Sequence, residues 1–352
     1  MKGFGLYSTN GFPVKGTIVC LLCISCSSCT YIQGYRKPIV KDLPQEQLYI
    51  YVRTHSTWQD FCYALDSADV LTDFKLFKDF AEWKGLPTKL KPGRYRLQPG
   101  MTSRQIVNLL LSGSQTPVKL TFHYVRTPWE VAGKAGRKLE TDSATIARFL
   151  NDSVFIASQL GFTKATLPAL FIPNTYEFYW NTSAEQFLAR MKQEYERFWT
   201  PTRRAQADSL KLSPVDVAIL ASIVQAEQAR FPDEWPVIAG LYLNRLRRDM
   251  PLESDPTVKF AWNDPGLQRV YHYHLKIDSP YNTYKYKGLP PGPILIPEPR
   301  AIDAVLNPAK HDYLYMCAKD DLSGRHNFAT HPAAHARNAR AYHKALNRLN
   351  IH

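Results

Sequence analysis

One apolar helix that ends in a carboxylic acid constrains this 352-residue chain more than any other feature. Ser213 stands where a helix cap is expected, Pro214 follows at the first helical position, and Asp216 has the spacing of a capping box. Apolar residues then recur at steps of three and four, and the same stripe reaches Glu227. The pattern predicts a helix over 213–227 with Glu227 on its apolar side.

A carboxylic acid in these surroundings is suited to proton transfer. Apolar neighbours destabilise its ionised form, so we expect the pKa of Glu227 to rise toward the range useful for donating a proton near neutrality. The alternative is that Glu227, at the helix end, simply turns outward into solvent as most isolated Glu residues do. The polar motifs that follow in the sequence favour the first interpretation.

Three such motifs follow the helix. Residues 255–257, Asp-Pro-Thr, read as a turn that presents a carboxylate and a hydroxyl. Residues 281–284, Tyr-Asn-Thr-Tyr, offer rings that stack on a pyranose and amides that bond hydroxyls, beside a rigid Pro-Pro-Gly turn at 290–292. Residues 326–328, His-Asn-Phe, precede a predicted terminal helix at 336–349. The candidate substrate-binding residues are Asp255, Thr257, Asn282, Thr283, Tyr284, Asn327 and His335.

The first forty residues have the pattern of an export signal. Two lysines precede an apolar run at 17–26, and Arg36 and Lys37 close the segment. The run is shorter than the ~20 residues of a comfortable membrane span, so a transmembrane anchor, a lipid anchor and a cleaved signal all stay open. Small residues before Cys26 and Cys29 are typical of lipidation, but the Leu expected three places before the lipidated cysteine is missing in both cases. We expect a membrane or lipid anchor rather than a free secreted form.

The cysteines are divided between this segment and the rest of the chain. Cys20, Cys23, Cys26 and Cys29 recur every three residues, as in an iron–sulfur site, but inside an export segment they are interpreted as small apolar residues. Cys62 and Cys317 remain, and they could form one disulfide in an oxidising compartment. A metal site built from cysteine is not expected.

The charge balance is basic, with 44 Lys and Arg against 31 Asp and Glu and a formal net charge of +13. Such a balance attracts polyanions, whether nucleic acid, anionic lipid or an acidic wall polymer. The basic residues are scattered, and no cluster is denser than those at 245–248 and 337–340. Nucleic acid is therefore not an expected partner, because its binding calls for a basic stripe or a known module.

Upstream of the helix, short elements of both kinds alternate. A strand at 49–52, helices at 58–65 and 73–83, a strand between two Pro-Gly turns, and a helix at 104–111 capped by Ser103 predict a small α+β unit. A strand at 118–125 and helices at 129–138, 142–151 and 184–198 open a second, larger part.

These residues together resemble the MltG (YceG-like) family of endolytic murein transglycosylases. The matching strings, in chain order, are 220–227, 244–246, 255–258, 281–284, 288–292, 307–310, 313–315 and 326–328, with His335 beyond them. Residues 173–176 resemble the family's Pro-Asp-Thr-Tyr, and 93–101 resemble part of its LysM-like domain. The resemblance runs from about residue 48 to the C-terminus.

The resemblance implies an α+β chain with three parts: a membrane segment at 1–40, a LysM-like domain at 45–116, and a mixed α/β YceG-type catalytic domain at 117–352. It implies a single anchor in the inner membrane, a catalytic part in the periplasm, and no cofactor. The implied partners are peptidoglycan glycan strands, the membrane and peptidoglycan synthases. Family members cut nascent strands between MurNAc and GlcNAc, which terminates the strand in a 1,6-anhydroMurNAc end, and their catalytic Glu falls on Glu227.

Two positions depart from the family pattern. Gln225 stands where a second Glu is common, and Asn174 replaces the usual Asp. Neither change removes Glu227, but the second weakens any argument that a carboxylate at 174 is required.

Three other classes of protein compete with this interpretation. A conventional hydrolase would pair Glu227 with Asp255, and a wall-binding protein would bind glycan without cutting it. A metal hydrolase could draw on the histidines at 272, 274, 326, 331 and 335, since His331 and His335 have a helical ligand spacing. That class is disfavoured because no acidic residue lies between His331 and His335, and Pro332 interrupts the start of the helix.

Overall fold

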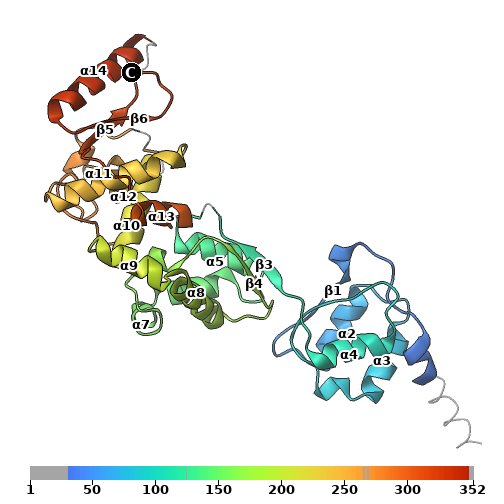
Figure 1. Cartoon of the computed structure of the whole chain (residues 1–352). Helices are drawn as coiled ribbons and strands as arrows, with labels where there is room; N and C mark the ends of the chain where they lie inside the picture. The colour runs from blue at the N-terminus through green and yellow to red at the C-terminus, as the bar shows by residue number, and fades with distance from the viewer. Residues whose placement is uncertain (1–30, 124, 265, 268, 349–352) are drawn as a thin grey trace, which may run out of the picture. The chain divides into compact units, whose positions relative to one another are not determined.

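The computed structural model describes residues 31–123, 125–264, 266–267 and 269–348 (Figure 1). The predicted apolar segment at 17–26, the four cysteines at 20, 23, 26 and 29, and residue 349 of the predicted terminal helix lie outside the described residues. Among the residues that are described, none of the helices combines the length and the apolar character needed to cross a membrane.

The described chain forms two compact units. The first extends to Val118 and also contains Tyr179–Asn181, and the second contains Lys119–Phe178 and the chain from Thr182 onward. The sequence placed the corresponding boundary between residues 116 and 117.

The first unit is built from short strands and helices around one apolar core. Its elements are η1 (Gln45–Leu48), β1 (Tyr49–Val52), α2 (Trp58–Ser67), α3 (Phe74–Trp83), η2 (Leu86–Thr88), β2 (Gly93–Arg96) and α4 (Ser103–Ser112). Strands β1 and β2 pair antiparallel with Tyr49 opposite Arg96. Phe77, Tyr95 and Ile106 are fully buried between the sheet and the helices.

The predicted cap of α4 was wrong by one residue. Thr102 is the N-cap, and it exchanges hydrogen bonds with Gln105 in a capping box. Ser103 becomes the first helical residue and is fully buried. At the other end, Gly113 adopts a left-handed conformation with φ of 71°, which ends the helix at low steric cost.

The second unit contains most of the helices. They are α5 (Pro128–Gly136), α6 (Ser143–Asn151), α7 (Ser153–Phe155), α8 (Ala184–Phe198), α9 (Pro201–Ser209), α10 (Pro214–Glu227), α11 (Trp235–Arg247), α12 (Asp255–Trp262), α13 (Pro299–Leu306) and α14 (Pro332–Arg348). Short turns of helix are η3 (Ile156–Leu160), η4 (Leu167–Leu170), η5 (Pro232–Glu234) and η6 (His274–Lys276), and the strands are β3 (Val118–Thr121), β4 (Thr175–Phe178), β5 (Tyr315–Ala318) and β6 (His326–Ala329). Strand β3 pairs with β4, and β5 pairs antiparallel with β6. The mixed α and β character expected from the sequence is confirmed.

Helix α10 occupies the centre of the second unit (Figure 1). The predicted cap is confirmed, since Ser213 and Asp216 exchange hydrogen bonds in a capping box and Pro214 opens the helix. The predicted one-sided apolar stripe was wrong, because every residue from 217 to 224 is buried. Helices α9, α11, α12 and α13 all contact α10, so it is enclosed on more than one face.

A buried serine ties the Pro-Pro-Gly loop to this central helix. Ser222 donates to the carbonyl of Ile219 and accepts a hydrogen bond from the backbone N–H of Ile294, at 2.7 and 3.0 Å. Gly292 packs so closely that a Cβ at this position would lie 1.9 Å from the carbonyl oxygen of Ala165. The loop predicted to be rigid is therefore held by contacts that tolerate no side chain at 292.

Candidate active site

Glu227 is the last residue of α10, and its side chain turns toward neighbouring elements. The hydroxyls of Tyr242, on α11, and Ser254, the N-cap of α12, both donate to Glu227 Oε1, at 2.6 and 2.5 Å. Among the described residues, no donor is assigned to the second oxygen, Oε2. The acid therefore has one oxygen held by protein and one that is available for a transferred proton.

Enclosure decides the protonation of this acid. Burial raises the pKa of the Glu227 carboxyl, and the hydrogen bonds from Ser254 and Tyr242 offset only part of that rise. The nearby negative charge of Asp255 raises this pKa further, whereas a positive charge on His326 lowers it. The direction expected from the sequence is confirmed, and its cause is the enclosure of the end of α10.

Replacing Tyr242 with Phe should move the pH dependence of any reaction that needs protonated Glu227. The phenol of Tyr242 keeps its proton, because burial raises its pKa well above the usual value, so it donates to the carboxylate at every working pH. Removing this donor destabilises the carboxylate, so Glu227 stays protonated to higher pH. We expect the alkaline limb of kcat/KM to move upward, with less than about a tenfold loss of maximum rate. A limb that moves to lower pH would contradict this assignment.

Residues 255–257 do not form the predicted turn. They make the first turn of α12, where Pro256 is accommodated because the first helical N–H groups have no intrahelical partner. This geometry separates the side chains: Thr257 is fully buried, whereas Asp255 is exposed. Asp255 accepts a hydrogen bond from the hydroxyl of Tyr284 at 2.7 Å.

Three of the predicted sugar-binding residues are buried, at 0 to 1% exposure: Thr257, Asn282 and Thr283. Thr283 Oγ1 accepts from the backbone N–H of Ser254 at 3.0 Å and lies 2.8 Å from Thr257 Oγ1. Asn282 donates to the carbonyls of Leu275 and Ile277. Thr257 and Thr283 therefore hold Ser254 in place, and Asn282 fastens the segment that contains Leu275 and Ile277.

A buried arginine supports the same region from α11. Arg245 is 4% exposed and donates to the carbonyls of Leu314, Pro251 and Leu252, at 2.6, 2.9 and 3.2 Å. It also pairs with Glu253 Oε2 at 2.7 Å. Glu253 has a φ of 55°, a left-handed conformation that is unfavourable for this residue type. Arg245 therefore holds a strained segment directly before Ser254.

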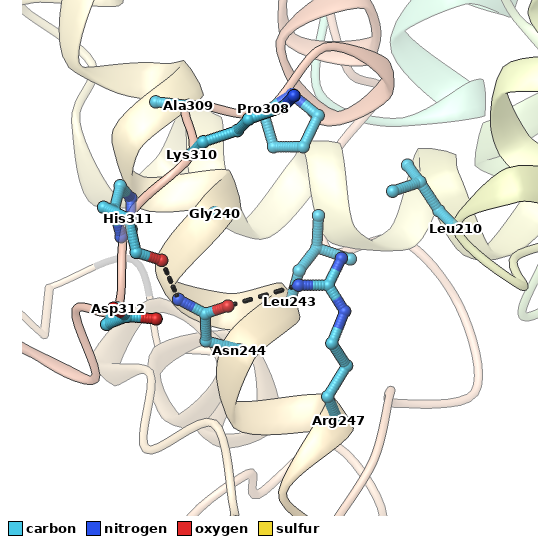
Figure 2. Close-up of a pocket in the computed structure, with 10 residues that line it drawn as sticks. All are labelled: Leu210, Gly240, Leu243, Asn244, Arg247, Pro308, Ala309, Lys310, His311 and Asp312. Carbon is cyan, nitrogen blue, oxygen red and sulfur yellow. Dashed lines mark hydrogen bonds between the residues drawn. The ribbon is translucent and has the colours of Figure 1, made fainter.

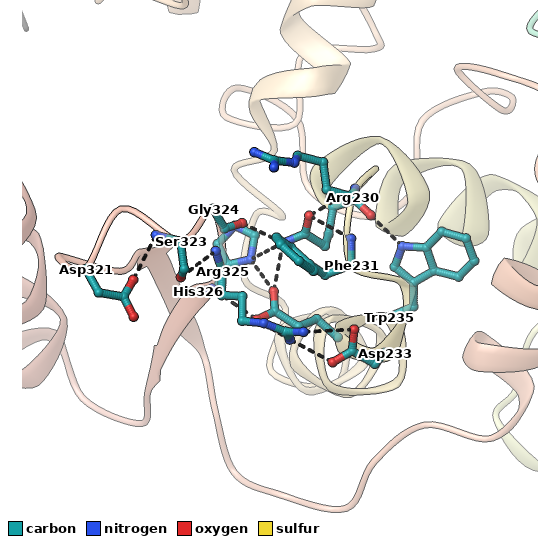
Figure 3. Close-up of polar contacts among 11 residues, drawn as sticks. Arg230, Phe231, Asp233, Trp235, Asp321, Ser323, Gly324, Arg325 and His326 are labelled. Carbon is teal, nitrogen blue, oxygen red and sulfur yellow. Dashed lines mark hydrogen bonds and ion pairs between the residues drawn. The ribbon is translucent and has the colours of Figure 1, made fainter.

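A second polar cluster begins at Gln228, the residue after Glu227. Figure 3 shows it between the end of α10, the start of α11 and the residues that enter β6. Gln228 Nε2 donates to Glu234 Oε2 and to the carbonyl of Gly324, both at 2.9 Å. His326 Nδ1 lies 2.8 Å from Glu234 Oε2. These bonds fasten the β5–β6 hairpin to the C-terminal end of α10.

The two predicted site residues near the C-terminus lie on different elements. Asn327 is half-buried on β6, opposite Cys317. His335, on α14, stacks on Tyr315 with ring centroids 5.4 Å apart. Burial, and then the positive charge of Arg245, lower the pKa of His335. The histidine whose charge acts on Glu227 is His326.

Within residues 31–348, the described part contains no group of three or more His, Cys, Asp or Glu side chains placed to hold a metal ion. Cys62 and Cys317 are both free thiols.

Several site residues carried no distinguishing signal in the sequence. Tyr242 lies in an apolar helix, where it reads as an ordinary core aromatic, and Ser254 reads as a loop serine. Glu234 follows a proline and an aspartate in a segment that reads as a solvated turn. The two departures from the family pattern serve the backbone: Gln225 accepts from the N–H of Glu298, and Asn174 accepts from the N–H of Thr175.

A pocket of about 560 Å³ lies on another face of α11 (Figure 2). Gly240, Leu243, Asn244 and Arg247 line it at helical spacing, together with Leu210 and residues 308–312. Asn244 donates to the carbonyl of His311 at 2.7 Å and accepts from Arg247. Tyr242 projects from the opposite side of the helix, about 200° around the axis from Gly240, so this pocket is separate from Glu227. Two of the family-like strings, 244–246 and 307–310, thus contribute residues to the same pocket.

Comparison with known proteins agrees with the resemblance seen in the sequence. Residues 50–341 match the model of the YceG-like family. An endolytic murein transglycosylase of Bacillus subtilis is 29% identical over 83% of this chain and 84% of its own length. One of Streptococcus pneumoniae is 30% identical over 80% of this chain, which spans 56% of that longer relative.

A solved structure is also similar. A crystal structure of a YceG-like protein from Listeria monocytogenes superimposes with a TM-score of 0.53 and 28% sequence identity, over 82% of this chain and 97% of the other. The family match covers most of the chain, including Glu227 and each of the loops that surround it. The chain belongs to the YceG-like family.

Proposed function

We propose that this protein is an endolytic lytic transglycosylase that cuts peptidoglycan strands between MurNAc and GlcNAc. The observation that carries the proposal is the enclosed carboxyl of Glu227, which has a raised pKa and one oxygen available for a proton. Its relatives from Bacillus subtilis and Streptococcus pneumoniae are endolytic murein transglycosylases, which supports the same substrate class.

Glu227 serves first as acid and then as base in this mechanism. Protonated Glu227 gives its proton from Oε2 to the glycosidic oxygen while the bond to C1 breaks through an oxocarbenium-like state. The carboxylate then takes the proton of the MurNAc C6 hydroxyl, whose oxygen attacks C1 of the same sugar. The proton removed restores the acid, and no water is consumed. The strand is left with a 1,6-anhydroMurNAc end, which ends its growth.

Asp255 lies near enough to Glu227 to act on it electrostatically. Its Oδ1 accepts from Tyr284, and its negative charge acts on Glu227 by raising the pKa of that acid. We assign Asp255 and Tyr284 to binding and to charge stabilisation at the reacting sugar. Asn327 and His335 stay candidates for contact with more distant parts of the strand.

Exposed aromatic rings extend along the chain from α12. Trp262, Tyr271 and Tyr273 are 39%, 51% and 60% exposed. Tyr271 and Tyr273 stack on each other with ring centroids 6.1 Å apart. Rings fixed in this way suit the apolar faces of pyranoses, so we place part of the glycan on this surface.

Mass spectrometry of products from purified glycan strands tests the proposed reaction. A lytic transglycosylase releases anhydro ends that are lighter by one water than the reducing ends made by a hydrolase. We expect anhydro products from the wild-type protein. Reducing ends would instead favour the hydrolase that pairs Glu227 with Asp255, and intact strands would favour a wall-binding protein.

The finer family expectations belong to the same proposal. They are a LysM-like fold for residues 45–116, an N-terminal anchor in the inner membrane with the catalytic part in the periplasm, and contact with peptidoglycan synthases. The order strand, helix, helix, strand of the first unit supports the first of these. The export pattern of the first forty residues supports the second.

A further inference from the structure

The polar cluster of Gln228, Glu234 and His326 contains an ion pair that has no part in the proposed mechanism. Glu234 is 7% exposed, and its carboxylate receives the side chains of Gln228 and His326 and the backbone N–H of His326. Burial alone would raise the pKa of Glu234, but the hydrogen bonds from Gln228 and His326 outweigh it and lower that pKa. Glu234 is therefore an ionised, acceptor-only group.

The donors around Glu234 assign the proton on the ring of His326. The two N–H groups of the Gln228 amide are used by Glu234 and by the carbonyl of Gly324. The 2.8 Å bond between His326 Nδ1 and Glu234 then needs a proton on Nδ1, because a carboxylate only accepts. A carboxylate on Nδ1 fixes the orientation of the ring and the nitrogen that carries the proton. Among the described residues, His326 Nε2 is assigned no hydrogen-bond partner.

We propose that His326, held by Glu234 and Gln228, is a positioning residue that places a positive charge beside Glu227 when Glu227 is a carboxylate. The inference rests on the proposed function of Glu227. Gln228 directly follows Glu227, and its side-chain amide donates to the carbonyl of Gly324 and lies 3.5 Å from His326 Nδ1, so a single residue links the two groups. An imidazolium there stabilises the carboxylate that forms when the glycosidic oxygen takes the proton.

Other charged and titratable groups lie around Glu227 and around the Glu234–His326 pair. Tyr242 on α11 and Asp255 on α12 act on Glu227. Arg325, before β6, lies 3.7 Å from Glu234 and is itself paired with Asp233. Asp233 is an exposed partner on the same two segments, and it provides a matched control.

Two substitutions at His326 separate charge from shape. His326→Asn keeps an amide N–H near the position of Nδ1 and loses the charge, so Glu227 should hold its proton to higher pH. We expect the alkaline limb of kcat/KM for anhydro-product release to rise by roughly half a pH unit or more. His326→Lys keeps a cation and should leave the limb at or below its wild-type position. Asp233→Asn should not move it.

The same variants have a readout that needs no catalysis. The infrared carbonyl band of protonated Glu227, identified by its loss in Glu227→Gln, should persist to higher pH in His326→Asn but not in His326→Lys. His326→Gln replaces His326→Asn if the latter does not fold. The proposal would be overturned if the alkaline limb of kcat/KM and the infrared band both stayed in place in His326→Asn. It would also be overturned if they moved in the same direction in His326→Asn and His326→Lys. A fall in the maximum rate alone would not rescue it. If wild type releases no anhydro products, the proposed function fails, and the infrared band alone decides the role of His326.

Discussion

Glu227→Gln is expected to reduce release of anhydro products by at least about a thousandfold. General acid catalysis contributes roughly 10²–10⁴-fold, and in the proposed mechanism one carboxyl serves both proton transfers, so no second group replaces it. The amide can still accept the hydrogen bonds of Tyr242 and Ser254 through its oxygen, so the geometry around Oε1 is retained. Mass spectrometry of products from purified strands, at matched protein concentrations, gives the measurement.

The same substitution should stabilise the fold at neutral pH. The pKa of Glu227 is raised in the folded protein, chiefly by burial, so the folded state binds this proton more tightly than the unfolded state does. Ionised Glu227 therefore costs stability above its folded pKa, and that cost disappears as the pH falls below the unfolded value of about 4.3. We expect a higher melting temperature for Glu227→Gln near pH 7 and no difference near pH 4.

A matched control is Glu196→Gln, which changes an exposed carboxyl on α8 of the same unit. It should alter neither activity nor melting temperature. The assignment would be wrong if Glu227→Gln released anhydro products at the wild-type rate. It would also be wrong if the melting temperature of Glu227→Gln, measured as the difference from wild type, were lower at pH 7 than at pH 4.

Arg245→Met is expected to lower the free energy of unfolding by about 3 kcal/mol or more. The guanidinium is buried and satisfies three backbone carbonyls and one carboxylate, and methionine can fill the space but donates nothing. The carbonyls of residues 251 and 252 would lose their donor, and Glu253 would lose the contact that holds its left-handed backbone. Because Ser254 follows directly, activity should fall as well.

Chemical denaturation followed by tryptophan fluorescence measures this loss. Arg247→Met, on the exposed side of the same helix, removes the same charge and a hydrogen bond to Asn244 only, so a change within about 0.5 kcal/mol is expected. Equal losses for the two variants would show that Arg245 does not support the site in the way the contacts indicate.

Local sequence signals were reliable where the cause was local. The start of α10 followed from Ser213, Pro214 and Asp216, because a cap satisfies its own helix end and needs no distant partner. The same logic was off by one residue at α4, where Thr102 and Ser103 are adjacent and both can cap. The raised pKa of Glu227 also followed, since the apolar run before it implies an enclosed helix end.

Side-chain direction after the helix could not be predicted in the same way. Asp255 and Thr257 are two residues apart, yet one is exposed and the other is buried against Thr283. A turn and a first helical turn have similar residue preferences, and only the packing of α12 on α10 selects the second. The predicted sugar-binding set therefore contains both exposed and buried residues, and its role in binding stays a prediction.

By itself, the sequence determined where the helices begin, that an acid closes the central one, and which family the chain resembles, because these depend on neighbours in the chain and on ordered motifs. Tertiary structure alone decided which groups meet that acid. Tyr242, Ser254 and His326 approach Glu227 from three other elements. Their contacts arise when other elements pack around α10. The sequence around a hydroxyl or an imidazole does not indicate which distant group it will contact.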